Sequence, residues 1–144
     1  GPGLNARLHM SLREKHGYTY NVESNYTAYS DTGLFSIYLG TDDRYLKKCI
    51  SLVRMELKLL RDKGLGTLQL HKAKQQLLGQ VAIAQENNQS QMLGIGKSLL
   101  LYNEVRTLKE MAAKIEGLTT SQLLRISNEI LNEKDFSYLI YKKK

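Results

Sequence analysis

The segment Leu12–Tyr20, LREKHGYTY, brings several chemically capable side chains close together: Arg13, His16, Tyr18 and Tyr20. An Arg guanidinium is a permanent cation that binds carboxylates and oxyanions, and an imidazole exchanges protons near neutral pH. A Tyr hydroxyl donates one hydrogen bond. Such groups could stabilise negative charge that develops on an oxygen atom during a reaction. The same residues also fit a helix that meets a strand at a turn, so the elements around them decide between the two readings.

No self-sufficient catalytic motif accompanies this segment in the sequence. His9, His16 and His71 form neither His-x-x-Glu-His nor His-Glu-x-x-His, the patterns that place two imidazoles and a carboxylate around zinc. Cys49, the single cysteine, lies within an amphipathic helical pattern and is expected to be buried and structural. Gly96–Ser98 resembles the end of a phosphate-binding loop, but Gln91 stands where that loop needs its first glycine. We expect no metal or cofactor on this chain.

A helix and a hairpin must position Arg13 and Tyr20. Leucines recur every fourth residue from Leu4, which predicts a helix that stops at Gly17. Residues alternate between apolar or aromatic and polar over 18–28, which is typical of a strand, and 34–40, LFSIYLG, is predicted as a second strand. Between them, Ser30–Gly33 has the composition of a turn. The sequence therefore predicts an antiparallel hairpin.

The rest of the chain changes to helical spacing. Predicted helices cover 43–63, a stretch from Thr67 that the polar run 85–91 interrupts or ends, 92–102, 108–115 and 121–131, and 135–142 is predicted as a closing strand. This order is not a regular strand–helix repeat. We therefore expect an α+β fold, with an antiparallel or mixed sheet and helices packed on one face, in a single domain over residues 1–144.

Composition excludes some classes of protein. The 144 residues are 42% hydrophobic, and no apolar run is long enough for a membrane span. The net charge of +7 could attract nucleic acid, but the charges are spread along the helices and the only run is Lys142–Lys144. We expect neither a nucleic-acid partner nor a membrane span.

Taken in order, the motifs resemble a known family. The pattern GPGLNARLHMSLREKHGYTYNVESNYTAYSDTG, followed by AKQQLLGQ, QENNQSQM and KIEGLTTSQLLRISNEIL, is similar to the downstream half of the inverted zinc peptidases, and most of all to bacterial members. These include pitrilysin, insulin-degrading enzyme and mitochondrial processing peptidase. The resemblance covers nearly the entire chain. No single motif is very specific, but their order and spacing together are.

The resemblance implies a non-catalytic C-terminal half of a zinc metalloendopeptidase. In that family a homologous upstream half carries the zinc and hydrolyses the peptide, and the two halves close around an extended peptide substrate. Zinc is then expected in the partner half only, and this chain alone should be inactive. The alternative is a relative on the same fold that has lost catalysis and serves as a structural or peptide-binding protein.

The resemblance also implies a role for two residues. In the family an Arg and a Tyr seven residues later reach from this half toward the active site, and Arg13 and Tyr20 have that spacing. Zinc-activated water builds negative charge on a peptide carbonyl oxygen, which a guanidinium or phenol would stabilise. The alternative is structural: strand alternation puts Tyr20 on the apolar face, and Arg13 could cover apolar surface or pair with Glu14.

The family's half-domain begins with a strand and a helix that precede the glycine-rich loop. This chain lacks both, so it is expected to be an N-terminally truncated domain. An open sheet edge would then remain, which a second copy or an extended peptide could cover. The single cysteine weakly favours a reducing compartment, so a bacterial cytoplasm is slightly preferred to the periplasm.

Overall fold

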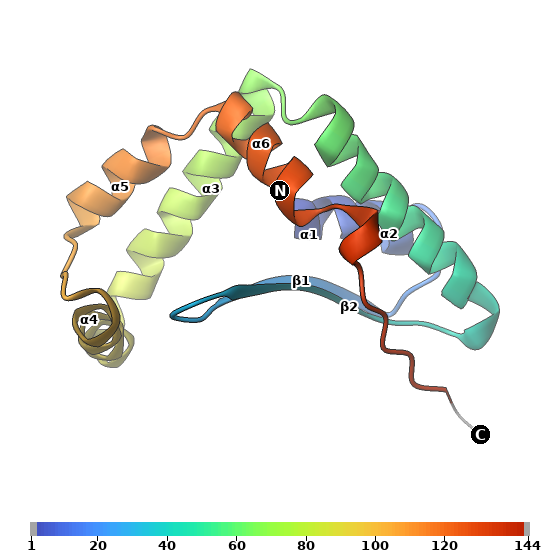
Figure 1. The fold of residues 1–144 in the computed structure, drawn as a ribbon, viewed down its shortest axis with the longest axis horizontal. Helices are drawn as coiled ribbons and strands as arrows, with labels where there is room; N and C mark the ends of the chain where they lie inside the picture. The colour runs from blue at the N-terminus through green and yellow to red at the C-terminus, as the bar shows by residue number, and fades with distance from the viewer. Residues whose placement is uncertain (1–2, 143–144) are drawn as a thin grey trace.

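The computed structural model describes residues 3–142, which form an arch of helices above a β-hairpin (Figure 1). The chain begins with α1 (Leu4–Leu8), which continues into a π-helical turn, η1 (His9–Glu14). Strands β1 (Asn21–Ala28) and β2 (Gly33–Gly40) follow. The remaining helices are α2 (Asp43–Lys63), α3 (Thr67–Gln85), α4 (Asn88–Tyr102), α5 (Leu108–Glu116), α6 (Thr120–Ile130) and the short 3-10 turn η2 (Glu133–Asp135).

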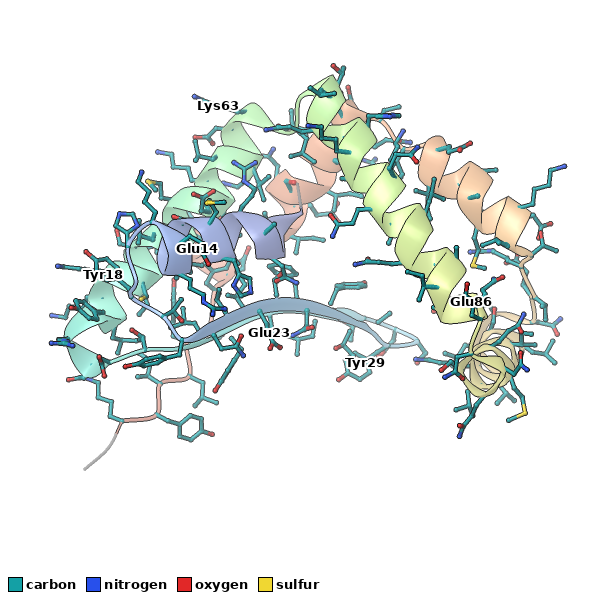
Figure 2. The ribbon with its side chains drawn as sticks, turned by 180° about the vertical axis from the view of Figure 1, so that it is seen from behind. Glu14, Tyr18, Glu23, Tyr29, Lys63 and Glu86 are labelled. Carbon is teal, nitrogen blue, oxygen red and sulfur yellow. The ribbon has the colours of Figure 1, made fainter. Side chains whose placement is uncertain are left out.

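The predicted hairpin is confirmed, with an antiparallel register that runs from Asn21 opposite Gly40 to Ala28 opposite Gly33. One face carries Val22, which is fully buried, and it packs against α1 and η1. The α+β class and the helices on one face of the sheet are confirmed as well. Figure 2 shows from behind that the hairpin extends well past this contact, with Tyr29 near its far end.

The fully buried core is small and lies where α1, η1, the hairpin and α2 meet. Leu8, Leu12, Val22 and Cys49 are completely buried, and partly buried residues such as Tyr18, Ile37 and Leu52 surround them. The expectation that Cys49 is buried is therefore confirmed. Elsewhere α3 packs on α4 and α5, and α6 packs on α2, with few fully buried side chains.

The predicted closing strand over 135–142 is wrong for the chain as it stands. Asp135 ends η2, and the residues from Phe136 to Lys142 have no ladder partner among the described residues. A strand exists only when its N–H and C=O groups pair with a neighbour, and among the described residues the sheet consists of β1 and β2 alone. Local apolar alternation therefore predicted a strand that tertiary structure does not form here.

The predicted strand start at Tyr18 is also wrong. Residues 18–20 are irregular and bend into the strand: the Tyr18 N–H donates to the Leu12 carbonyl, and the Thr19 hydroxyl lies 2.7 Å from the carbonyls of both Asn21 and Gly40. The ladder begins only at Asn21. Within the described residues, no helix is long and apolar enough to cross a membrane.

Candidate functional site

Arg13 lies in the last turn of η1 and its side chain is exposed. The wide turn comes from a hydrogen bond that spans five residues, from the Lys15 N–H to the Met10 carbonyl. Such π-helical turns are rare and frequently occur at functional sites. Within residues 3–142, the Arg13 guanidinium has no hydrogen bond or ion pair. It is therefore available to an external anion.

Tyr20 is exposed as well, with 75% of its surface accessible. Strand alternation placed it on the apolar face with Val22, but Tyr20 precedes the ladder, so that alternation does not apply to it. Packing in the core of this chain therefore does not explain why a tyrosine occupies position 20. Its backbone N–H donates to the Gly40 carbonyl at 3.0 Å, which fixes the residue at the base of the hairpin.

The two residues stand at opposite ends of one short turn. This turn reverses direction at Gly17, whose positive φ of 62° is easy for glycine and strained for other residues. The Tyr18 N–H closes it by donating to the Leu12 carbonyl at 2.9 Å. Arg13 and Tyr20 therefore belong to one corner of the molecule.

The other two candidates from this segment, His16 and Tyr18, have packing contacts. His16 Nδ1 lies 2.6 Å from the Ser11 carbonyl, so this nitrogen carries the proton and donates it. The His16 ring stacks on Tyr18 at 5.2 Å, and Tyr18 stacks on Tyr45 at 4.6 Å between ring centroids. Lys48 lies 5.4 Å above the Tyr18 ring, a distance at which a cation is attracted to an aromatic face.

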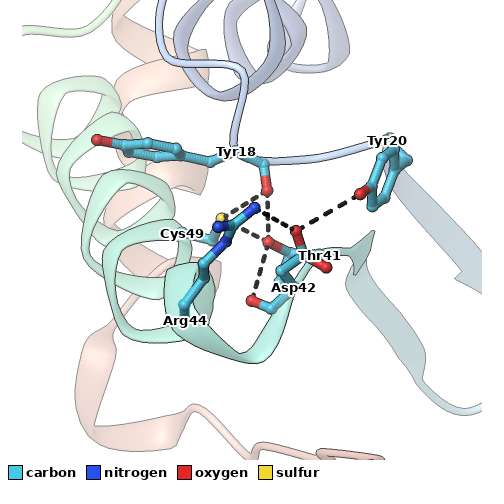
Figure 3. Close-up of polar contacts among 6 residues, drawn as sticks. All are labelled: Tyr18, Tyr20, Thr41, Asp42, Arg44 and Cys49. Carbon is cyan, nitrogen blue, oxygen red and sulfur yellow. Dashed lines mark hydrogen bonds and ion pairs between the residues drawn. The ribbon is translucent and has the colours of Figure 1, made fainter.

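Thr41 and Asp42 directly precede α2, and the structure connects both residues to the site (Figure 3). The Thr41 hydroxyl donates to the Tyr18 carbonyl. The Tyr20 hydroxyl donates to Asp42 Oδ2 at 3.5 Å, and Arg44 Nη2 lies 3.3 Å from the same oxygen. No spacing rule would reveal this contact, because Tyr20 and Asp42 are separated by the whole hairpin.

Metal-holding groups do not converge here. Among the described residues no group of three or more His, Cys, Asp or Glu side chains could hold a metal ion. The arrangement offers the exposed Arg13 guanidinium, which can bind an anion, and the exposed Tyr20 hydroxyl, which can donate a hydrogen bond and lies 3.5 Å from the Asp42 carboxylate. These groups could stabilise negative charge on an oxygen atom.

Comparisons with known proteins match this chain to a family. Residues 1–77 match the family described as the peptidase M16 inactive domain. An uncharacterized zinc protease of Streptomyces coelicolor is 29% identical over 93% of this chain, and the rat mitochondrial-processing peptidase subunit alpha is 23% identical over the same share. The chain spans only 29% and 25% of the length of these two relatives.

A solved structure supports the fold. The crystal structure of a peptidase M16 inactive domain from Pseudomonas fluorescens superimposes with a TM-score of 0.73 and 27% identity, and it covers 88% of this chain and 30% of that one. The resemblance drawn from the motifs is thus confirmed over the matched residues. From the match over its first 77 residues and from the shared fold, the chain belongs to the peptidase M16 inactive-domain family.

Proposed function

We propose that this chain is the non-catalytic half of a zinc-dependent metalloendopeptidase, which closes over a zinc-bearing half and helps to bind an extended peptide. Membership in the inactive-domain family supports the first part. The observation that carries the second part is the large apolar surface that the chain leaves uncovered.

The chain exposes far more surface than a compact protein of its size. Its accessible surface is 10917 Å², whereas a compact monomer of 16.4 kDa exposes about 7,500 Å². The difference of about 3,400 Å² is roughly four times the 800 Å² that one partner buries in a standard-size interface. An obligate polypeptide partner accounts for that area better than a transient contact does.

The uncovered surface has two prominent parts. Helix α4 has no buried residue although it carries Met92, Leu93, Leu99 and Leu100, and a helix that is apolar on several sides is normally buried. The C-terminal segment 136–142 exposes the consecutive residues Tyr138, Leu139, Ile140 and Tyr141, and such an apolar run is typical of strands that a sheet buries on both faces.

The domain itself is proposed to be larger than this chain. A further strand, supplied by another part of the same protein, would pair with segment 136–142 and extend the two-stranded sheet. The ion pair between Lys142 Nζ and Asp43 Oδ1, at 2.7 Å, holds the end of the segment near the start of α2 and close to the end of β2. Zinc belongs to the partner half in this proposal. Peptide substrate, a second copy of the chain and a cytoplasmic location stay predictions.

Arg13 and Tyr20 are the residues through which this half would assist hydrolysis. When zinc-activated water attacks a peptide carbonyl, negative charge develops on oxygen. An unpaired guanidinium and an exposed phenol placed at that oxygen would stabilise the transition state, and removal of one such donor typically costs about 100- to 1,000-fold in turnover.

The test is reconstitution of this chain with a zinc-bearing half, followed by peptide-cleavage kinetics. Arg13→Ala and Tyr20→Phe should each lower turnover by roughly 100- to 1,000-fold. Arg125→Ala and Tyr26→Phe are matched controls, because both residues are exposed and lie on other elements, and they should leave turnover unchanged. Normal kinetics for both Arg13→Ala and Tyr20→Phe would remove these residues from the site. The chain without its partner should cleave no peptide, with or without added zinc.

The alternative is a structural or peptide-binding relative without catalysis, and the same reconstitution separates the two. Peptide binding without cleavage by the assembled halves, in the presence of zinc, would favour the alternative.

A further inference from the structure

Asp42 occupies the N-cap position of α2 but does not cap the helix. An Asp at an N-cap normally accepts a hydrogen bond from a backbone N–H in the first turn. In this chain Asn87, Thr107 and Thr119 do so at the starts of α4, α5 and α6. The Asp42 side chain makes no such bond. Helix capping, the usual role of an Asp at this position, therefore does not explain how the Asp42 side chain is oriented.

The Asp42 carboxylate instead faces the base of the hairpin. Its Oδ2 accepts from the Tyr20 hydroxyl at 3.5 Å and from Arg44 at 3.3 Å (Figure 3). The bond to Tyr20 is long and therefore weak. The Tyr20 hydroxyl can therefore exchange Asp42 for another acceptor at a small cost in free energy. When no other acceptor is present, the ring still prefers the orientation that points its hydroxyl toward Asp42.

Arg44 also contacts the Asp42 carboxylate, and its own guanidinium packs on an aromatic ring. Its guanidinium carbon lies 4.7 Å above the Tyr45 ring, and Tyr45 stacks on Tyr18. The Thr41 hydroxyl, next to Asp42 in the chain, donates to the Tyr18 carbonyl. The start of α2 is thereby attached to both ends of segment 18–20. Asp42 therefore lies beside Tyr20 at the base of the hairpin, although the whole hairpin separates the two residues in the sequence.

We propose that Asp42 is a positioning residue for Tyr20. By accepting a hydrogen bond from the phenol in the resting chain, it biases the Tyr20 ring toward one orientation, so that less rotational freedom is lost when the hydroxyl engages a substrate oxygen. The consequence for catalysis rests on the proposed function of Tyr20. The restriction of the ring does not, because it is a property of this chain alone.

The test is NMR spectroscopy of the chain, with three-bond couplings between the α and β protons of Tyr20 as the readout of its side-chain rotamer. The Tyr20 signals are assigned from their loss in Tyr20→Phe. In the unmodified chain one rotamer should dominate, and Asp42→Ala should produce averaged couplings. Asp42→Asn keeps an acceptor oxygen and should retain most of the preference. The matched control is Asp43→Ala, because Asp43 is the adjacent carboxylate and pairs with Lys142 instead.

Each outcome has a definite meaning. Unchanged Tyr20 couplings in Asp42→Ala would overturn the proposal, and so would equal averaging in Asp43→Ala. Unreactive Cys49 in each variant verifies that the fold is intact, since this thiol is fully buried. In the reconstituted enzyme, Asp42→Ala should lower kcat for a peptide more than it raises KM, and by less than Tyr20→Phe does, because the contact that it weakens is made in the transition state. If the couplings respond as expected but Tyr20→Phe leaves turnover normal, Asp42 still positions Tyr20 and only the proposed function of Tyr20 fails.

Discussion

At the scale of single residues, the buried side chains and the exposed ones of the same type have very different roles. Leu12 on η1 is completely buried, whereas Leu100 on α4 is 88% exposed. This difference in burial does not follow from helix propensity, because the intrinsic propensity of leucine is the same wherever it stands. Their contribution to stability depends on what covers them.

Leu12→Ala should lower the free energy of unfolding by about 2–5 kcal/mol, because it leaves a cavity in the small core. Leu100→Ala serves as the control and should change it by less than about 0.5 kcal/mol in the isolated chain. Urea denaturation of both variants checks this. Similar losses for the two leucines would show that α4 is buried in solution.

Cys49 should resist thiol reagents in the folded chain. Its Sγ is fully buried and lies 3.5 Å from Thr41 Oγ1 and 3.7 Å from the Tyr18 carbonyl. Thiol reactivity requires access of the reagent to the thiolate, so modification should become rapid only after denaturation. Labelling with a chromogenic disulfide reagent, with and without urea, measures this. Rapid native-state labelling would contradict the position of Cys49 in the structure.

At the scale of elements, caps define where the later helices begin. Thr119 accepts from the Gln122 N–H at 3.2 Å, and Gln122 Oε1 accepts from the Thr119 N–H at 2.8 Å. This reciprocal pair is a capping box. The sequence predicted the cap at Thr119 and Thr120, and the structure confirms it at Thr119.

Thr119→Ala should destabilise the folded chain by about 1 kcal/mol, because the Gln122 N–H at the start of α6 loses its partner. Thr119→Ser should restore most of the loss, since serine keeps the hydroxyl. Thermal unfolding followed by circular dichroism compares the three proteins. Equal stability of the Ala and Ser variants would rule out the capping explanation.

An ion pair connects the end of the chain to α2. Arg54 Nη2 lies 2.6 Å from Glu133 Oε2, and this hydrogen bond lowers the pKa of Glu133 from its ordinary value of 4.5. A carboxylate with a lowered pKa in the folded state stabilises that state above its unfolded pKa and loses this contribution as the pH falls through the folded value. The pair should therefore act fully above about pH 5 and weaken below pH 4.5.

Glu133→Gln should remove this part of the pH dependence. Between pH 6 and 3, amide exchange in segment 131–142 should accelerate in the unmodified chain more than in the variant. Glu129→Gln is the control, since Glu129 is an exposed carboxylate on α6 with no ion pair among the described residues. Parallel pH profiles for the unmodified chain and Glu133→Gln would contradict the role of the Arg54 pair.

At the scale of the whole molecule, the surface left open has a measurable consequence. The urea dependence of unfolding scales with the surface that unfolding exposes. Because about 3,400 Å² of additional surface is already accessible in the folded chain, its m-value should be lower than that of a compact 144-residue protein. Addition of the partner half should raise it. An ordinary m-value for the chain alone would show that this surface is covered in solution.

Leu139→Lys addresses the C-terminal segment directly. Leu139 is 80% exposed, so the substitution should leave the stability of the isolated chain unchanged. It should weaken association with the partner half by at least tenfold, because a charge would enter a strand buried on both faces. Leu100→Lys on α4 is the comparison variant, because it shows whether a lysine at another exposed apolar position weakens association to the same extent. Sedimentation velocity with both variants provides the comparison.

The sequence by itself determined the helices, the hairpin and its turn, because periodicity, caps and turn residues act over a few neighbouring positions. It also contained the order of motifs that identifies the family, and it marked Arg13 and Tyr20 by their spacing. Tertiary structure decided that Tyr20 is exposed, that Asp42 faces it, and that segment 136–142 is no strand. These features depend on contacts between residues far apart in the chain, or on a neighbouring strand being present, and no local pattern encodes either.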